Sequence, residues 1–211
     1  PYKYVPNKIK DSDYKKCTTK SYIFKKYETY SLNMEVDLPA QGKAPYPFIV
    51  YVHGGGWTSG NTNAFANHSK YMASNGIAGV RITYTLNKNG GHFDMGLQEI
   101  AEAFDFIKMH AKEWNLDIKQ FGFAGGSAGT PLSSYWAMKM KDCKLYIGCN
   151  GIYDFTNNLP KGSFPGKNPY LRNIGTEERA GLVYTSPSPR NRQKARRPAS
   201  ASKQNIIYHV L

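Results

Sequence analysis

The sequence contains little cysteine and no long hydrophobic run. Its three cysteines, Cys17, Cys143 and Cys149, are an odd number without C-x-x-C spacing, so we expect neither a zinc site nor a disulfide framework. A single bridge between Cys143 and Cys149 stays open beside the favoured interpretation of free, partly buried thiols. No window approaches the roughly 18 consecutive apolar residues of a membrane-spanning helix. Because the sequence starts at Pro1, it is silent about a signal peptide and leaves the compartment open.

Acidic residues are absent from residues 186–211. The chain as a whole has a net charge of +13, and this basic segment carries six of its lysines and arginines. Its prolines, serines and few large apolar side chains cannot offset the entropy lost on ordering, which predicts a poorly ordered tail. The arginines also lack interleaved aromatic residues, so we expect weak, salt-dependent attraction to phosphate and no specific nucleic-acid partner.

The rest of the chain is long enough for one domain with a substantial core, since 40% of the 211 residues are hydrophobic. We expect an extended, lysine-rich arm over residues 1–20, a single domain over 21–185, and the basic tail over 186–211. Hydrophobic patterns predict strands at 21–27, 32–38, 47–52, 77–84, 120–124 and 144–149. Helices are predicted at 63–74, 95–113 and after residue 129.

This alternation of strands and helices predicts an α/β fold with a doubly wound, mostly parallel sheet. The first two strands would form an antiparallel pair at one edge. In the helix at 95–113, apolar residues recur three and four positions apart, with Ile100, Phe104 and Ile107 among them. His110 is expected on the solvent-facing flank of this helix.

Two glycine-rich motifs each follow a predicted strand. Residues 125–129, Gly-Gly-Ser-Ala-Gly, lie between a strand and a helix and match the G-x-S-x-G pattern, which places a serine hydroxyl on a sharp, exposed turn. Residues 53–57, His-Gly-Gly-Gly-Trp, follow another strand upstream. Ligands bind at the carboxyl ends of strands in such sheets, so both motifs are expected at one edge.

Together the motifs supply part of the chemistry of ester hydrolysis. Ser127 would be the nucleophile, and the backbone amides of Gly55, Gly56 and Ala128 would stabilise the oxyanion. Trp57 would either line the substrate pocket or pack in the core. This chemistry needs neither a cofactor nor a metal, and we expect none. The partner would be a small-molecule ester.

The first residue of the upstream motif, His53, is expected to brace the glycine loop rather than to act as a base.

The chain resembles the α/β-hydrolase superfamily, in the branch of hormone-sensitive-lipase-like and bacterial acetyl-xylan and feruloyl-type carboxylesterases. The resemblance covers about residues 21–155 and rests on residues 47–57, 75–84 and 114–129, which occur in the family's order. It implies that Ser127 is the nucleophile, that Gly55, Gly56 and Ala128 form the oxyanion hole, and that short acyl or aryl esters, carbohydrate-linked ones included, are substrates. Thr130 stands where such enzymes often carry another glycine.

The second half of the family's catalytic machinery is not recognisable. Its acid and histidine loops should follow about residue 185, where the basic tail occurs instead, so we expect a truncated or frame-shifted end and a sheet without its usual C-terminal strands. Only His209 follows Ser127, and Asp154 with His209 would preserve the order Ser–Asp–His. A sheet lacking its last strands would also have an unpaired edge that favours an oligomer.

Three functions follow from these observations. The first is a serine carboxylesterase, which would be nearly inert if the acid and base are missing. The alternative is a catalytically dead binding or interaction protein with a hydrolase fold. A peptidase or amide hydrolase of the same superfamily also stays open, because the serine motif does not identify the leaving group.

Overall fold

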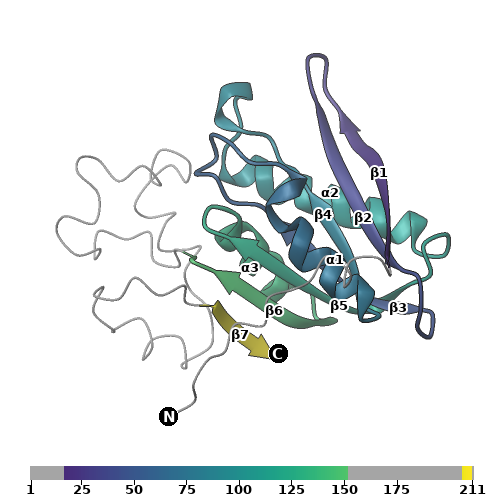
Figure 1. Ribbon diagram of the computed structural model, residues 1–211. Helices are drawn as coiled ribbons and strands as arrows, with labels where there is room; N and C mark the ends of the chain where they lie inside the picture. Colours follow the sequence, from purple (N-terminus) through teal and green to yellow (C-terminus); the bar gives the residue numbers. More distant parts are fainter. Residues whose placement is uncertain (1–16, 152–205, 211) are drawn as a thin grey trace, which may run out of the picture.

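The computed structural model describes residues 17–151 and the backbone of residues 206–210, which form a seven-stranded sheet with helices on both faces (Figure 1). The strands are β1 (Cys17–Lys26), β2 (Ser31–Pro39), β3 (Tyr46–Val52), β4 (Ala78–Ile82), β5 (Leu116–Gly126), β6 (Cys143–Cys149) and β7 (Ile206–Val210). The helices are η2 (Thr62–Phe65), α1 (Ala66–Ser74), η3 (Asn87–Asn89), α2 (Phe93–His110) and α3 (Gly129–Lys139), where η marks a short 3-10 helix.

The sheet order is β1-β2-β4-β3-β5-β6-β7. The four central strands are parallel, whereas β1, β2 and β7 join them in antiparallel pairings. The predicted α/β class, the doubly wound sheet and the antiparallel edge pair are therefore confirmed. In this arrangement the carboxyl ends of β3 and β5 lie beside each other, with Val52 paired to Gly125.

Both ends of the sheet differ from the sequence-based boundaries. Strand β1 begins at Cys17, so residues 17–20 belong to the sheet rather than to an extended arm. Strand β7 lies inside the predicted tail and pairs with β6, so the edge of β6 that we expected to be unpaired has a partner. Its sequence, Ile-Ile-Tyr-His-Val, is rich in the β-branched and aromatic residues that favour strands.

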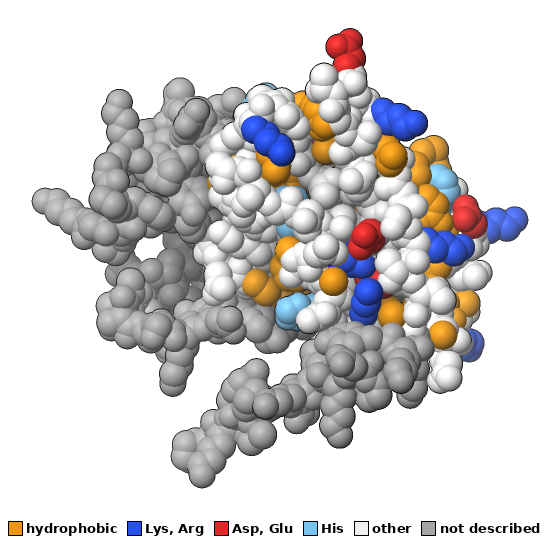
Figure 2. Space-filling view, turned by 45° about the horizontal axis from the view of Figure 1, so that its top comes forward, with side chains coloured by type: hydrophobic (Ala, Val, Ile, Leu, Met, Phe, Trp, Pro, Cys, Tyr) orange, Lys and Arg blue, Asp and Glu red, His pale blue; other side chains and the backbone are white. Residues whose placement is uncertain are grey.

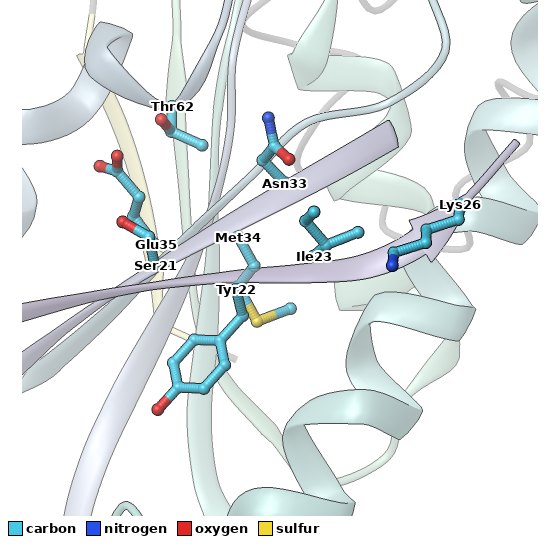
Figure 3. A pocket seen from close by; sticks show the side chains of 8 residues that line it. All are labelled: Ser21, Tyr22, Ile23, Lys26, Asn33, Met34, Glu35 and Thr62. Carbon is cyan, nitrogen blue, oxygen red and sulfur yellow. The ribbon is translucent and has the colours of Figure 1, made fainter. Parts of the chain in front are cut away.

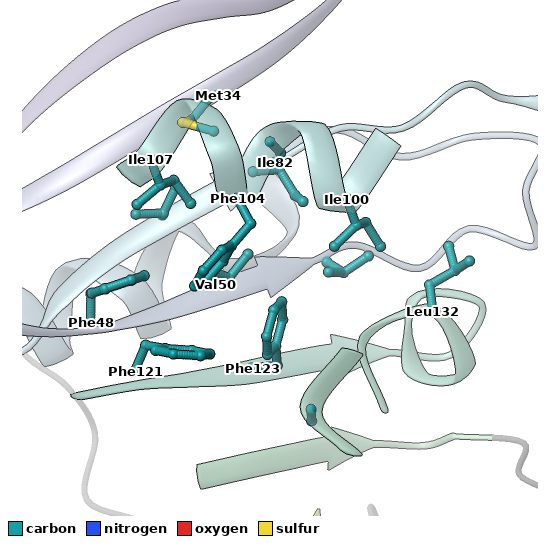
Figure 4. Close-up of a cluster of buried hydrophobic side chains, with 14 of the residues drawn as sticks. Met34, Phe48, Val50, Ile82, Ile100, Phe104, Ile107, Phe121, Phe123 and Leu132 are labelled. Atoms are coloured by element: carbon teal, nitrogen blue, oxygen red, sulfur yellow. The ribbon is translucent and has the colours of Figure 1, made fainter. Parts of the chain in front are cut away.

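The main core lies between the sheet and the pair α2 and α3 (Figure 4). The predicted stripe of α2 faces the sheet, with Ile100, Phe104 and Ile107 all buried. The Phe104 ring lies 4.7 Å from the Phe121 ring and 6.0 Å from that of Phe123, measured between centroids. Phe121 and Phe123 share this face because side chains alternate along a strand.

A smaller cluster on the opposite face contains Ile49, Tyr51, Phe65 and Ala124, packed against Met72 of α1. The two faces of the sheet are thus both covered by helices, as the run of apolar residues in β3 requires.

His110 is half-buried, whereas the sequence predicted a solvent-facing flank. Its ring stacks on Phe106 at 4.2 Å and on Trp114 at 5.0 Å, and Tyr22 of β1 lies 6.0 Å away. The indole N–H of Trp114 donates to the Tyr22 hydroxyl at 2.9 Å. The edge strand therefore covers a helix flank that the local sequence pattern marks as exposed.

None of the three cysteines forms a disulfide, as favoured from their number and spacing. Within the part of the chain that the structure describes, no helix is both long and apolar enough to cross a membrane.

Candidate active site

Ser127 occupies the sharp turn between β5 and α3. Its backbone is left-handed, with φ of 46°, a conformation that costs a non-glycine residue roughly 1–2 kcal/mol. Hydrogen bonds hold the residue from both sides: its amide donates to the Cys149 carbonyl at 2.9 Å, and its carbonyl accepts from the Thr130 amide at 3.0 Å. The serine is thus fixed in a strained turn of the kind that the G-x-S-x-G pattern predicts.

The glycines on either side of this turn are required by close packing. A Cβ at Gly125 would lie 2.6 Å from the Gly129 carbonyl oxygen, and a Cβ at Gly129 would lie 2.3 Å from that of Val52 and 2.4 Å from that of His53. Real Cβ atoms essentially never approach so closely. Helix α3 can therefore begin against the carboxyl end of β3 only because both residues lack side chains.

The two glycine motifs meet at this edge of the sheet. A Cβ at Gly54 would lie 2.7 Å from the Gly126 carbonyl oxygen and 3.0 Å from the Cβ of Ser127. The sequence separation between these contacting residues is more than 70 positions. The glycine loop, defined as residues 53–60, therefore packs directly against the serine turn.

Three backbone amides of the two glycine motifs have no hydrogen-bond acceptor among residues 17–151. Within residues 17–151, no hydrogen-bond acceptor faces the amides of Gly55, Gly56 or Ala128, whereas the Ser127 amide is bonded to Cys149. Ala128 is fully buried, and its N–H has no acceptor among residues 17–151. Gly55 and Gly56 have φ of 114° and 62°, which glycine adopts without a steric penalty.

His53 is buried and braces the glycine loop. Its Nδ1 lies 2.7 Å from the Gly54 carbonyl oxygen, and its ring stacks on Tyr84 at 4.4 Å between centroids. The Tyr84 hydroxyl donates to the His53 carbonyl at 3.0 Å. Burial lowers the pKa of His53 below its usual 6.5, although the contact with the Gly54 carbonyl opposes the shift. The ring is therefore neutral at pH 7, as suits a structural brace.

Trp57 belongs to the main core, where its side chain is only 1% exposed. Its backbone is left-handed with φ of 60°, and its carbonyl accepts from the Asn87 amide at 2.8 Å. This burial favours the packing alternative, in which the indole holds the glycine loop against the core, and the substrate-binding role stays a prediction.

A buried charged network supports the other flank of the serine turn. The guanidinium of Arg81 donates to both oxygens of Asp37, at 2.7 and 3.0 Å, and to the Thr62 carbonyl at 2.8 Å. Thr62 begins η2, which ends at Phe65, and the Phe65 ring lies 3.2 Å from the position of a Cβ at Gly126. The network thus fixes η2 against the sheet beside Ser127.

A groove of about 740 Å³ lies over β1 and β2, and its lining includes Glu35 and Thr62 (Figure 3). None of its lining residues belongs to either glycine motif, so it is separate from the serine turn. No group of His, Cys, Asp or Glu suited to holding a metal ion occurs among the described residues. On the face in Figure 2, lysines and arginines lie singly, with acidic side chains between them.

Among residues 17–151, no acid and base are hydrogen bonded to the Ser127 hydroxyl. Asp154 lies outside the described residues. The backbone of His209 in β7 pairs with Tyr146 of β6. Tyr146 in turn pairs with Phe123 of β5, which lies four residues before Ser127. This register leaves His209 short of the carboxyl edge of the sheet. Within residues 17–151, no side chain hydrogen bonds to the Ser127 hydroxyl.

Several supporting residues were missed from the sequence. Tyr84 and Asn87 anchor the glycine loop, and the hydroxyls of Thr58 and Ser59 bond to the carbonyl of Gly55. The bonds of Thr58 and Ser59 could have been predicted, because Ser and Thr side chains in turns commonly hydrogen bond to nearby backbone groups. The role of Tyr84 depends on the parallel pairing of β3 with β4, which no local pattern specifies.

Residues 34–161 match the model of the BD-FAE family, which is α/β-hydrolase-like. The chain belongs to the BD-FAE family. This assignment confirms the resemblance to α/β-hydrolases that rests on the two glycine motifs. Both motifs lie inside the matched BD-FAE region.

Relatives of this BD-FAE chain include named esterases. An acetyl esterase of Salmonella typhi is 25% identical over 126 residues, covering 56% of this chain and 39% of that protein. Thus the chain spans about two fifths of the length of the curated relatives it matches. Among solved structures, esterase 2 of Thermogutta terrifontis phosphonylated by sarin is 21% identical with a TM-score of 0.63, covering 75% and 64% of the two chains. A bacterial heroin esterase is 20% identical with a TM-score of 0.54, covering 61% and 41%. At these identities the structural likeness shows the shared fold.

Proposed function

We propose that this chain carries the nucleophile and the oxyanion hole of a serine carboxylesterase. The observation that carries the proposal is the contact of Gly54 with Ser127, where a Cβ would lie 3.0 Å from that of the serine. Further support comes from the left-handed backbone of Ser127 and from the amides of Gly55, Gly56 and Ala128, which have no acceptor among residues 17–151. The relatives named as acetyl esterases support the choice of short acyl esters as substrates.

In the proposed reaction, the Ser127 hydroxyl attacks the ester carbonyl and passes its proton to a base. The carbonyl oxygen becomes an oxyanion, which the amides of Gly55, Gly56 and Ala128 stabilise by hydrogen bonding. Collapse of the tetrahedral intermediate expels the alcohol and leaves an acyl-serine. Water then releases the acid by the same route. Each missing donor of this kind typically raises the barrier by about 2.7–4 kcal/mol.

Short acyl or aryl esters, carbohydrate-linked ones included, are the proposed substrates. Asp154 and His209 remain the candidate acid and base because they keep the order Ser–Asp–His. The register of β7 weighs against His209 as the base, since the backbone of His209 is level with Phe123 rather than with Ser127.

The second candidate function is a binding protein with a hydrolase fold and no turnover. It is favoured by the absence, among residues 17–151, of a side chain bonded to the Ser127 hydroxyl. Loss of the base lowers turnover on the order of 10⁶-fold, while the oxyanion hole and binding alone retain about 10³–10⁴ over water.

Hydrolysis of p-nitrophenyl acetate by the full chain, beside Ser127→Ala, separates the two functions. The esterase predicts turnover that Ser127→Ala removes, and His209→Ala and Asp154→Asn then show whether these residues are the base and acid. Equal rates for the full chain and Ser127→Ala would contradict the esterase. Parallel assays with p-nitrophenyl octanoate, methyl ferulate and an acetyl-amino-acid p-nitroanilide define the acyl and aryl preference and test the peptidase alternative.

A further inference from the structure

The carbonyl of Gly55 has more hydrogen-bond donors than a turn requires. It accepts from the amides of Thr58 at 3.0 Å and Ser59 at 3.1 Å, which close the turn. It also accepts from the hydroxyl oxygens of the same two residues, Thr58 Oγ1 at 3.0 Å and Ser59 Oγ at 3.3 Å. A carbonyl oxygen has two lone pairs, so the two amides alone would satisfy it. The two hydroxyl groups are therefore not needed to satisfy the Gly55 carbonyl, and their effect is to restrain its orientation.

This restraint falls on the peptide that carries a candidate oxyanion donor. The bond between Gly55 and Gly56 is a planar trans peptide, in which the C=O and the N–H point in opposite directions. Donors that hold the Gly55 carbonyl toward Thr58 and Ser59 therefore hold the Gly56 N–H toward the opposite side. Gly54, one residue before this peptide, is the residue that contacts Ser127.

Steric forces alone would leave the same peptide free to rotate. Glycine lies on both sides of it, and glycine accepts positive and negative φ about equally well. The following residue, Trp57, is left-handed with φ of 60°, so the turn that these hydrogen bonds close contains a strained residue. Hydrogen bonds can therefore set the orientation of the peptide, and those observed are the four to the Gly55 carbonyl.

We infer that the hydroxyls of Thr58 and Ser59 are positioning groups that aim the Gly56 amide at the oxyanion by clamping the carbonyl of the same peptide. The inference rests on the proposed function, because it takes the Gly56 amide as an oxyanion donor. The side chains act through the peptide and do not contact the reacting atoms. Their effect should appear in the reactivity of Ser127 and in the direction of one N–H bond, with little change in folding.

The test compares the full chain with Thr58→Val and Ser59→Ala, singly and together. Thr58→Ser combined with Ser59→Thr keeps both hydroxyls and serves as the rescue variant. Ser134→Ala is the matched control, because it removes a similar hydroxyl-to-carbonyl bond, Ser134 Oγ to Pro131 O at 3.1 Å, within α3. Each protein is treated with a fluorophosphonate probe, and the second-order rate of Ser127 labelling is measured by intact mass, together with Tm. The residual dipolar coupling of the Gly56 amide is measured on the same ¹⁵N-labelled proteins.

The double variant should label about tenfold more slowly, as expected for two lost hydrogen bonds, with an altered Gly56 coupling and a nearly unchanged Tm. The rescue and control variants should match the parent in rate and coupling. An unchanged coupling in the double variant would overturn the inference, because the peptide would not need the hydroxyls. So would an altered coupling with an unchanged labelling rate. If the parent itself is not labelled, the proposed function fails, and the coupling still decides whether the hydroxyls orient the amide.

Discussion

The serine edge of the sheet and the Asp37–Arg81 network are close together, because Arg81 is level in the sheet with Ala124, three residues before Ser127. Their polar groups differ in hydrogen bonding. In the network, the fully buried Asp37 accepts from Thr19 at 2.6 Å, from Ser69 and twice from Arg81. At the serine edge, the amides of Gly55, Gly56 and Ala128 have no acceptor within residues 17–151.

Backbone strain divides the same two regions. Ser127 and Trp57 are both left-handed without being glycine, and both belong to the glycine motifs. Strand β4, which carries Arg81, contains no residue with positive φ. A paired buried charge is costly to break from one side, whereas strain and unbonded donors persist only where the surroundings hold them in place. Changes at the serine edge should therefore affect reactivity, and changes in the network should affect stability.

The largest expected effect is that of Ser127→Ala on reactivity. Removing the nucleophile of a complete serine-hydrolase site lowers turnover on the order of 10⁶-fold, so ester hydrolysis and fluorophosphonate labelling should fall to background. The free energy of unfolding should change little, because the two backbone hydrogen bonds of residue 127 do not involve its side chain. Fluorophosphonate labelling measures the reactivity and urea unfolding measures the stability. A large loss of stability in Ser127→Ala would contradict the assignment of this residue to reactivity alone.

The next largest effect is expected from Arg81→Met on stability. It leaves the Asp37 carboxylate buried with half of its donors, and breaking a buried ion pair from one side typically costs about 3–5 kcal/mol. The matched control is Lys108→Met, which breaks the exposed Lys108–Asp105 pair of 2.6 Å and should cost less than about 1 kcal/mol. Urea titration measures both variants.

The folded fraction of Arg81→Met should still label at Ser127 at a rate near that of the parent. A stable variant that labels much more slowly would show that the network serves the chemistry through η2 rather than the fold alone.

A smaller effect, on reactivity first, is expected from Gly54→Ala. The new Cβ would lie 2.7 Å from the Gly126 carbonyl oxygen and 3.0 Å from the Cβ of Ser127, so the glycine loop must move away from the serine. If one oxyanion donor is lost, labelling should slow by about 10²–10³-fold. Gly76→Ala is the control, because nothing lies within 4 Å of its Cβ position, although its φ of 87° strains an alanine. It should cost stability and leave labelling unchanged, and a slow Gly76→Ala would contradict the steric explanation.

The serine edge could be predicted from the sequence because each motif is local. Gly125 to Gly129 specify a turn with a serine at its centre within five residues, and the approach of the two motifs follows from a parallel sheet. The network could not be predicted, because Asp37 and Arg81 meet only when β2 pairs with β4 across an intervening stretch of chain.

The partial burial of His110 was missed for the same reason, since a strand distant in sequence supplies Tyr22. Contacts between residues close in the sequence leave a recognisable local pattern. Contacts that depend on the order of strands in the sheet do not.

The smallest effect is a pH dependence that separates the brace from the catalytic groups. Burial lowers the pKa of folded His53 below 6.5, so the unfolded chain binds a proton that the folded chain does not as the pH falls below 6.5. The contribution of His53 to the free energy of unfolding is therefore complete above pH 6.5 and is lost progressively below it. Urea unfolding between pH 7.5 and about pH 5 should show a smaller decline for His53→Gln than for the parent. His68→Gln, at an exposed position, is the control and should follow the parent. An identical decline in His53→Gln would show that the ring is protonated in the folded chain, and would reopen its assignment as a structural brace.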